Sequence, residues 1–177
     1  MRGNPAIRIV AFAGAGLLAA AGWYLGSPLF IRTTTNEPAP TLAIGTARAS
    51  VAPGTTPLAV ISADALTKVI ARGELQYVDS LHNGTGPVIL MRVGVQQFLR
   101  FEDVAITNAP DVPVYLSRET GGRWSEATSL YLGPLKATNG SFNYELAGGT
   151  DLSPYRSVVV WCRAFSMLVT WADLRPA

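Results

Sequence analysis

The longest hydrophobic segment of the chain covers residues 9–31 and contains no charged residue. A helix rises about 1.5 Å per residue, so this segment could cross the roughly 30 Å hydrocarbon core of a bilayer. A helix also satisfies its own backbone hydrogen bonds in lipid. Trp23 and Tyr24 suit the membrane interface, and Pro28 suits a helix end. The pattern predicts a transmembrane anchor that binds the protein to a bilayer.

Arginines flank this segment and predict its orientation. Arg2 and Arg8 precede it, so the positive-inside rule places residues 1–8 in the cytoplasm and the chain after Arg32 outside. The alternative is a cleaved signal peptide, because the three alanines at 19–21 resemble a small-residue cleavage site. The length of the apolar run favours an uncleaved anchor. The expected location is the cytoplasmic membrane, with a single pass and the domain outside.

The next segments lack the periodicity of a folded core. Residues 32–57 contain prolines among Thr and Ala residues, which predicts a flexible, extended linker. A lead-in follows over residues 58–72, and a short helix is possible over 62–72. Ser62 would be its N-cap and Gly73 its stop signal. The apolar residues of its one face would be Leu66, Val69 and Ile70.

From residue 73 onward, short apolar runs alternate with turn residues. Phe142, Tyr144 and Leu146 alternate with polar residues, which is typical of a strand buried on one face. Asn83-Gly84 and Asn139-Gly140 are strong turn dipeptides. The runs predict eight strands, at Leu75–Val78, Val88–Val93, Gln97–Phe101, Val112–Leu116, Ser129–Leu132, Phe142–Leu146, Ser157–Ala164 and Met167–Trp171.

No ten-residue helical period interrupts this region. The predicted fold is therefore all-β, a small β-sandwich (or barrel) of about eight strands over residues 73–174, preceded by one transmembrane helix and a flexible linker. Phe142, Tyr144, Trp161 and Trp171 are expected as core aromatics.

Charge gives no reason to expect a nucleic-acid partner. The formal net charge is +2, and the three arginines within residues 1–32 are not offset by any acidic residue there. The remainder of the chain is therefore almost neutral, without the basic surface that phosphate binding requires.

The residue inventory also excludes several chemistries. The chain has one cysteine, Cys162, so no intramolecular disulfide can form. It has one histidine, His82, so a closed zinc site is not expected. CxxC, CxxCH, GxSxG and P-loop motifs are absent from the sequence. Nothing supports a stand-alone enzyme; at most we expect a redox or electron-transfer accessory.

The order of residues in the β region is similar to that of a known family. The similar segments are His82-Asn83-Gly84-Thr85-Gly86, Leu99-Arg100-Phe101-Glu102-Asp103, Asn108-Ala109-Pro110-Asp111, and Ser157-Val158-Val159-Val160-Trp161-Cys162 followed by Phe165. These segments resemble the electron-transfer DM-thirteen domain family, a companion of DOMON domains, over about residues 73–174. Ala109 departs from the family's usual glycine. Gly-Ser-Pro-Leu-Phe at 26–30 also resembles the leader of bacterial membrane-anchored members.

The resemblance implies an extracytoplasmic β-sandwich with a redox role centred on the cysteine, as a free thiol or as a ligand to a group such as haem. It also implies a redox partner protein. Cys162 is then the redox and cofactor-binding candidate, and His82 is a weaker candidate for both roles.

Two interpretations of these residues stay open. Alternation along Ser157–Ala164 points Cys162 inward, where free cysteine is often a small packed hydrophobe. His82 lies in a turn, and a redox role requires it to face Cys162 and activate the thiol or share a haem. The alternative function is a non-redox structural or ligand-binding β-module tethered at the cell surface.

Overall fold

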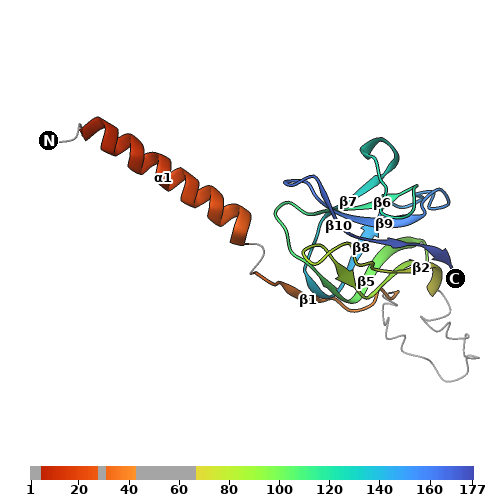
Figure 1. Ribbon diagram of the computed structural model, residues 1–177. Coiled ribbons are helices and arrows are strands. Elements are labelled where there is room, and N and C mark those ends of the chain that lie inside the picture. Colours follow the sequence, from red (N-terminus) through yellow and green to blue (C-terminus); the bar gives the residue numbers. More distant parts are fainter. Residues whose placement is uncertain (1–4, 28–30, 43–66) are drawn as a thin grey trace, which may run out of the picture.

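The computed structural model describes residues 5–27, 31–42 and 67–177, with side chains of the N-terminal helix described from Phe12 onward. The helix α1 (Pro5–Gly26) precedes a β domain (Figure 1). The strands, in chain order, are β1 (Thr34–Asn36), β2 (Thr67–Glu74), β3 (Gly84–Thr85), β4 (Pro87–Val93), β5 (Gln96–Ile106), β6 (Pro113–Ser117), β7 (Leu130–Pro134), β8 (Asn139–Leu146), β9 (Ser157–Cys162), β10 (Met167–Asp173) and β11 (Arg175–Pro176). A short 3-10 helix, η3 (Glu126–Thr128), lies between β6 and β7.

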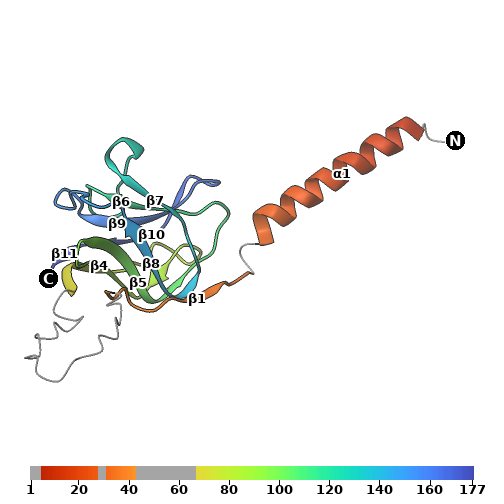
Figure 2. The same ribbon diagram turned by 180° about the vertical axis from the view of Figure 1, so that it is seen from behind.

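The strands form two sheets that lie one above the other in Figures 1 and 2. The seven-stranded sheet A has the order β1-β8-β5-β4-β2-β11, with β3 paired to β5. The four-stranded sheet B has the order β10-β9-β6-β7. Within the described residues the fold is therefore a two-layered β domain, as the sequence predicts. Seven of the eight predicted strands correspond to β4 through β10, and the total is eleven because β1, β2, β3 and β11 were not predicted as strands. Of these four, β1, β3 and β11 are too short for hydrophobic alternation to show.

One hydrophobic core fills the space between the sheets. Phe101 on β5 stacks on Phe142 on β8, with ring centroids 4.9 Å apart, and Tyr144 meets both rings edge-on. Sheet B contributes small apolar side chains to this core. They are Val114, Leu116, Val158, Val160, Cys162, Val169 and Ala172. The prediction that Phe142 and Tyr144 are core aromatics is confirmed.

The outer face of sheet A carries a second, smaller cluster, formed by Ile89, Met91 and Val93. Leu42, from the segment after β1, packs against it. Residues 31–42 therefore belong to the β domain, and the structure corrects the start of the predicted linker over 32–57. Residues 43–57 of that linker lie outside the described part of the chain.

Strand β1 could not be recognised from the sequence. Thr34, Thr35 and Asn36 pair in parallel with Asn139, Gly140 and Ser141 of β8. A three-residue strand of polar side chains has no apolar alternation to detect. The partner strand also departs from expectation, because Asn139-Gly140 lies inside β8 and not in a turn.

Gly140 is required where β1 meets β8. Its φ of +99° lies in a region that favours glycine, and a Cβ there would overlap the Thr35 carbonyl oxygen. The Asn-Gly pair was expected to form a hairpin turn, but its glycine allows the close approach of β1 instead.

The side chain of Glu37 fastens this N-terminal segment to sheet A. One carboxylate oxygen accepts a hydrogen bond from Lys136 Nζ at 2.9 Å, and the other accepts one from the Asn143 backbone N–H at 2.8 Å. Burial alone would raise the pKa of Glu37, but the bonds from Lys136 and Asn143 outweigh it and hold the pKa below its usual value. The Glu37 carbonyl also accepts a bond from the buried Arg100.

Two sequence-based assignments near β2 are wrong. Residues 67–72 of the possible helix over 62–72 belong to strand β2, and residues 62–66 lie outside the described part. The register shifts between Val69 and Ala71, so Ile70 and Ala71 both pack against the inner core while Val69 packs against the outer cluster. This bulge interrupts the period-two alternation of β2, and the segment therefore looks helical in sequence. The predicted strand Leu75–Val78 is a loop after β2.

The helix α1 presents large apolar side chains to its surroundings, including Phe12, Leu17, Leu18 and Trp23. Within residues 5–27, 31–42 and 67–177, no helix is both long enough and apolar enough to cross a membrane. The structure thus does not confirm the anchor predicted over residues 9–31.

We predict that Glu37→Gln lowers the free energy of unfolding by about 1 kcal/mol at pH 7, because it removes the charge that Lys136 and Asn143 bind. The folded-state pKa lies below the usual 4.5, so this stabilisation is present above pH 4.5. It is lost as the pH falls through the folded-state pKa. Urea unfolding of both proteins at pH 7 and pH 3 measures the difference. Glu126→Gln, at an exposed position of η3, is the matched control.

Candidate functional site

Cys162 is the last residue of β9, and alternation along that strand turns it toward the core, as predicted. Its exposed fraction is 0%, and it shares the inner face of the strand with Val158 and Val160. The predicted strand Ser157–Ala164 ends two residues early, because residues 163–166 turn the chain into β10. The thiol therefore lies at one end of the sandwich, just before this turn.

The loop between β5 and β6 covers the thiol. Cys162 Sγ donates a buried hydrogen bond to the Pro110 carbonyl oxygen at 3.2 Å. The next residues hold the loop in place, since the Arg163 N–H donates to the Asp111 carbonyl oxygen and its guanidinium lies 3.2 Å from the Asp111 carboxylate. Asp111 has a φ of +49°, in the left-handed region. Access to the thiol thus requires this clamped loop to move.

His82 lies in the loop between β2 and β3, where it is bound to Asp79. His82 Nδ1 lies 2.9 Å from Asp79 Oδ2, and the His82 backbone N–H donates to Asp79 Oδ1. The hydrogen bond from the His82 side chain, helped by the Leu81 N–H, holds the pKa of Asp79 below its usual value. The His82 side chain is 14% exposed. It is therefore a largely buried, partnered histidine rather than an exposed turn residue.

Glycine 84 fixes the position of this loop against sheet B. A Cβ at Gly84 would lie 2.7 Å from the Thr170 hydroxyl oxygen on β10. Thr170 in turn donates a hydrogen bond to the Gln76 carbonyl oxygen at 2.7 Å. Asn83-Gly84 was expected as a turn, but Gly84 is in β3 and allows close packing onto β10.

Both candidate residues are connected to the loop between β5 and β6. The Thr107 N–H donates to the Asn83 carbonyl oxygen at 2.9 Å, next to His82. Three residues later, Pro110 accepts the bond from Cys162. Among the described residues, no hydrogen bond or ion pair joins His82 to Cys162 directly. The structure brings both residues to one loop but does not make them a bonded pair.

A comparison with known protein families identifies the β domain. The family model described as Electron transfer DM13 matches residues 76–174, which is more than half of the chain. The chain belongs to the electron transfer DM13 family. No curated protein and no solved structure matches it.

A haem does not fit this DM13 site as it is arranged here. An axial sulfur ligand needs an open coordination direction next to room for the macrocycle. The Cys162 sulfur is fully buried among core side chains and bonded to Pro110, which leaves no open coordination direction. The described residues also hold no group of three or more His, Cys, Asp or Glu side chains that could bind a metal ion.

An aromatic layer on the outer face of sheet B was not expected from the sequence. Trp161 and Trp171 lie there and are partly buried rather than enclosed in the core, so their assignment to the core was wrong. Trp124 lies 4.5 Å from Tyr115 and 5.1 Å from Trp161, measured between ring centroids. The Arg163 guanidinium donates to the Tyr115 hydroxyl at 3.1 Å, which connects this layer to the loop over the thiol. Arg163 is the residue of the site that sequence reasoning missed.

We predict that a small thiol reagent labels native Cys162 at least a hundredfold more slowly than an exposed thiol, because the covering loop must first open. Asp111→Asn removes the ion pair with Arg163, and asparagine tolerates the left-handed backbone. It should speed labelling several-fold. Ala127→Cys in a Cys162→Ala background supplies the exposed thiol, and Glu119→Gln breaks a distant ion pair as control. Fast labelling of the native wild-type protein would contradict the buried site.

Proposed function

We propose that this DM13 protein is a membrane-anchored, extracytoplasmic electron-transfer domain and that Cys162 is its redox group. The match to the electron transfer family over residues 76–174 carries the proposal, because this segment contains the only cysteine of the chain. The proposal assigns no role to haem, since the site does not fit it.

With a single thiol, the chain must exchange electrons through a second molecule. Cys162 attacks one sulfur of a disulfide, the old sulfur–sulfur bond breaks, and a new one forms at Cys162 Sγ. The other sulfur leaves and takes up a proton as a thiol. Cys162 is thereby oxidised and the incoming disulfide is reduced. The partner is a protein or small molecule that carries a disulfide.

The covering loop controls this exchange. Its closed position is held by the Cys162–Pro110 hydrogen bond and by the contacts between Arg163 and Asp111. Local opening of such a segment costs less than global unfolding, so the thiol can react while the sheets stay paired. The loop thus makes the exchange selective for partners that displace it.

His82 is the second, weaker candidate in this mechanism. With Nδ1 donating to the Asp79 carboxylate, the neutral ring leaves Nε2 as a proton acceptor. No described residue forms a hydrogen bond with Nε2. His82 is connected to the covering loop through the bond between Thr107 and Asn83, and we propose that it accepts the thiol proton when that loop moves.

Equilibration with glutathione redox buffers tests the proposal. The native full chain should gain and lose one glutathione reversibly as the buffer ratio changes, measured by mass spectrometry after acid quenching. Cys162→Ala should abolish the adduct and retain the β-rich circular dichroism spectrum. Asp111→Asn should speed the exchange without changing the final ratio much, because it acts on the loop. An adduct that forms only in denaturant would refute the redox assignment.

A second candidate function is supported by the complete burial of Cys162. A fully enclosed thiol that donates to a carbonyl oxygen behaves as a small packed side chain. The domain would then be a non-redox structural or ligand-binding module. This alternative predicts that Cys162→Ala costs about 1–2 kcal/mol of stability and changes no redox property.

The membrane anchor is the part of the proposal that rests on the N-terminal segment. Residues 9–31 are uncharged, α1 exposes large apolar side chains, and Arg2 and Arg8 precede them. The positive-inside rule then leaves the N-terminus in the cytoplasm and the β domain outside.

We predict that alkaline phosphatase fused after Ala177 is active in a bacterial host, because that enzyme requires export. The chain should remain in the membrane fraction after washing at high pH. An active cytoplasmic reporter at the same position would contradict the orientation, and release of the washed chain would indicate cleavage or peripheral attachment.

A further inference from the structure

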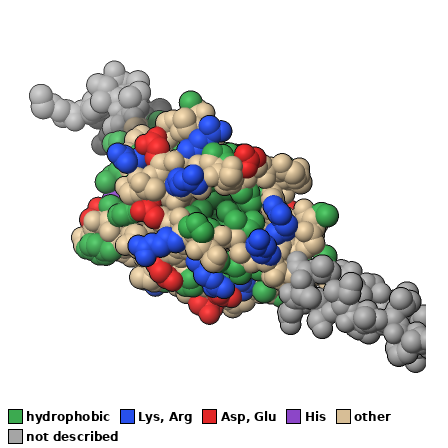
Figure 3. Space-filling view, turned by 90° about the vertical axis from the view of Figure 1, so that its right-hand side faces the viewer, with side chains coloured by type: hydrophobic (Ala, Val, Ile, Leu, Met, Phe, Trp, Pro, Cys, Tyr) green, Lys and Arg blue, Asp and Glu red, His purple; other side chains and the backbone are tan. Residues whose placement is uncertain are grey.

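A second feature lies at the opposite end of β9 from Cys162. A cavity of about 750 Å³ opens there between β2, β4, the loop from β8 to β9 and the C-terminal residues. Its size is within the range of sites that bind small molecules. Figure 3 shows on this side of the molecule a hollow floored by hydrophobic side chains and bordered by Lys and Arg.

The mouth of the cavity carries like charges in direct opposition. Lys68 on β2 is the cross-strand partner of Arg92 on β4. Both side chains are exposed, and alternation along β4 places Arg92 on the same face as the core residue Leu90. Like charges directly opposite each other destabilise a sheet. An anion bound between them would remove this repulsion.

Cations outnumber carboxylate side chains among the residues that line this cavity, because Lys68, Arg92 and Arg156 share it with Asp151 alone. Arg156, a third cation at the cavity, donates to the Ser153 carbonyl oxygen. Within the described part of the chain, none of the three cations forms an ion pair. The nearby Asp151 carboxylate accepts a bond from the Ser153 N–H, which holds its pKa below the usual value.

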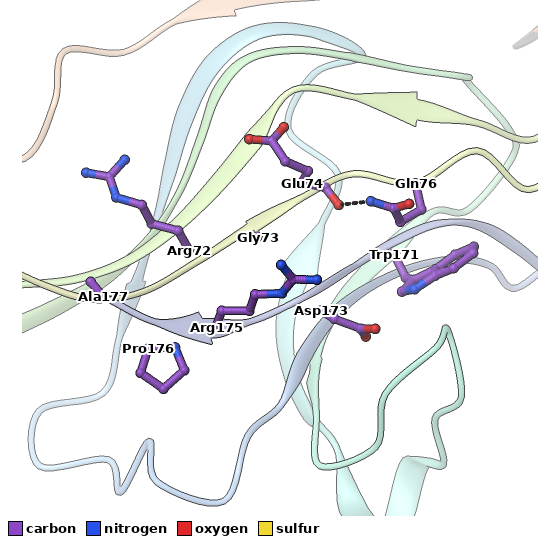
Figure 4. Close-up of a pocket in the computed structure, with 9 residues that line it drawn as sticks. All are labelled: Arg72, Gly73, Glu74, Gln76, Trp171, Asp173, Arg175, Pro176 and Ala177. Carbon is purple, nitrogen blue, oxygen red and sulfur yellow. Dashed lines mark hydrogen bonds between the residues drawn. The ribbon is translucent and has the colours of Figure 1, made fainter.

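A neighbouring groove, lined by β2, β10 and the C-terminal residues, contains equal numbers of basic and acidic side chains. In Figure 4, Arg72 lies at the opposite end of the groove from Trp171, with Arg175 between them, and the two arginines are also cross-strand partners. That groove also contains Glu74 and Asp173, so its charges are balanced. The cavity at Lys68 has no such balance and is the more selective site for an anion.

The floor of the cavity is apolar. Ile70, Leu90, Leu152 and Leu174 line it, and all four belong to or pack against the core between the sheets. Buried Gln97 borders it, and with its amide oxygen toward Arg92 it accepts from that guanidinium at 3.1 Å while its nitrogen donates to the loop. This contact fixes Arg92 at the mouth.

We propose that this cavity binds an anionic amphiphile. Its carboxylate or phosphate group lies between Lys68, Arg92 and Arg156, and its aliphatic body lies on the apolar floor. The proposal does not depend on the redox role of Cys162, which is at the other end of the same strand.

The test uses the full chain in phosphatidylcholine nanodiscs, with radiolabelled octanoate as the probe in equilibrium dialysis and empty discs as the blank. Saturable binding of octanoate is expected, without competition from octanol. Lys68→Gln and Arg92→Gln should each weaken binding about tenfold, because each removes a charged partner of the anion. Arg123→Gln, at an exposed arginine of the β6–β7 loop, should bind as the wild type does. Absence of saturable binding, or equal affinity of Arg92→Gln, would overturn the proposal.

Thermal unfolding separates binding from folding. Without octanoate, Lys68→Gln should raise Tm by about 2 °C, because it relieves the repulsion from Arg92. A Tm that falls together with affinity would assign the lysine a structural role and overturn the proposal.

Nanodiscs that contain phosphatidylglycerol distinguish a lipid head group from a free anion as the ligand. A lipid head group in the site lowers the apparent octanoate affinity in these discs, whereas a free anion as ligand leaves it unchanged.

Discussion

The packing of the two sheets is the constraint on which the rest of the structure depends. A chain with one cysteine has no internal disulfide, so the free energy of folding comes from the apolar interior. At its centre, Phe101 and Phe142 stack from neighbouring strands of sheet A, and the valines of sheet B close over them. Cys162 is part of this interior. Any reaction at its sulfur is therefore coupled to the packing that holds the domain together.

This coupling explains the arrangement of the candidate site. In the proposed exchange, a partner must displace the 107–112 loop, and the closed loop would protect the thiol from oxidation by other molecules. The contacts between Arg163 and Asp111 set how much that movement costs. Because Arg163 also donates a hydrogen bond to Tyr115, its side chain contacts both the aromatic layer on sheet B and the loop over the thiol.

The sequence predicts the two-layered β architecture and the inward direction of Cys162, because both follow from period-two alternation in long strands such as β8 and β9. It fails where backbone geometry departs from that period. The bulge at Val69–Ala71 places Ile70 and Ala71 on the same face of β2 and so interrupts its alternation, and Gly140 made a strand position look like a turn. The partner of His82 and the Arg163 clamp depend on contacts between distant segments, and one sequence carries no signal for them.

Because β1 is part of sheet A, the segment that connects the helix to the β domain is much shorter than the linker predicted over residues 32–57. Leu42 packs on sheet A and Thr67 begins a strand of the same sheet, so the described residues on both sides of positions 43–66 belong to one domain. The only connection between α1 and the domain is the stretch between Gly26 and Thr34. At no more than about 3.5 Å per residue, those seven residues hold the start of β1 within roughly 30 Å of the helix end. If α1 is anchored in a membrane, this short connection keeps the β domain close to the bilayer. The domain could then contact only partners that are near the membrane surface.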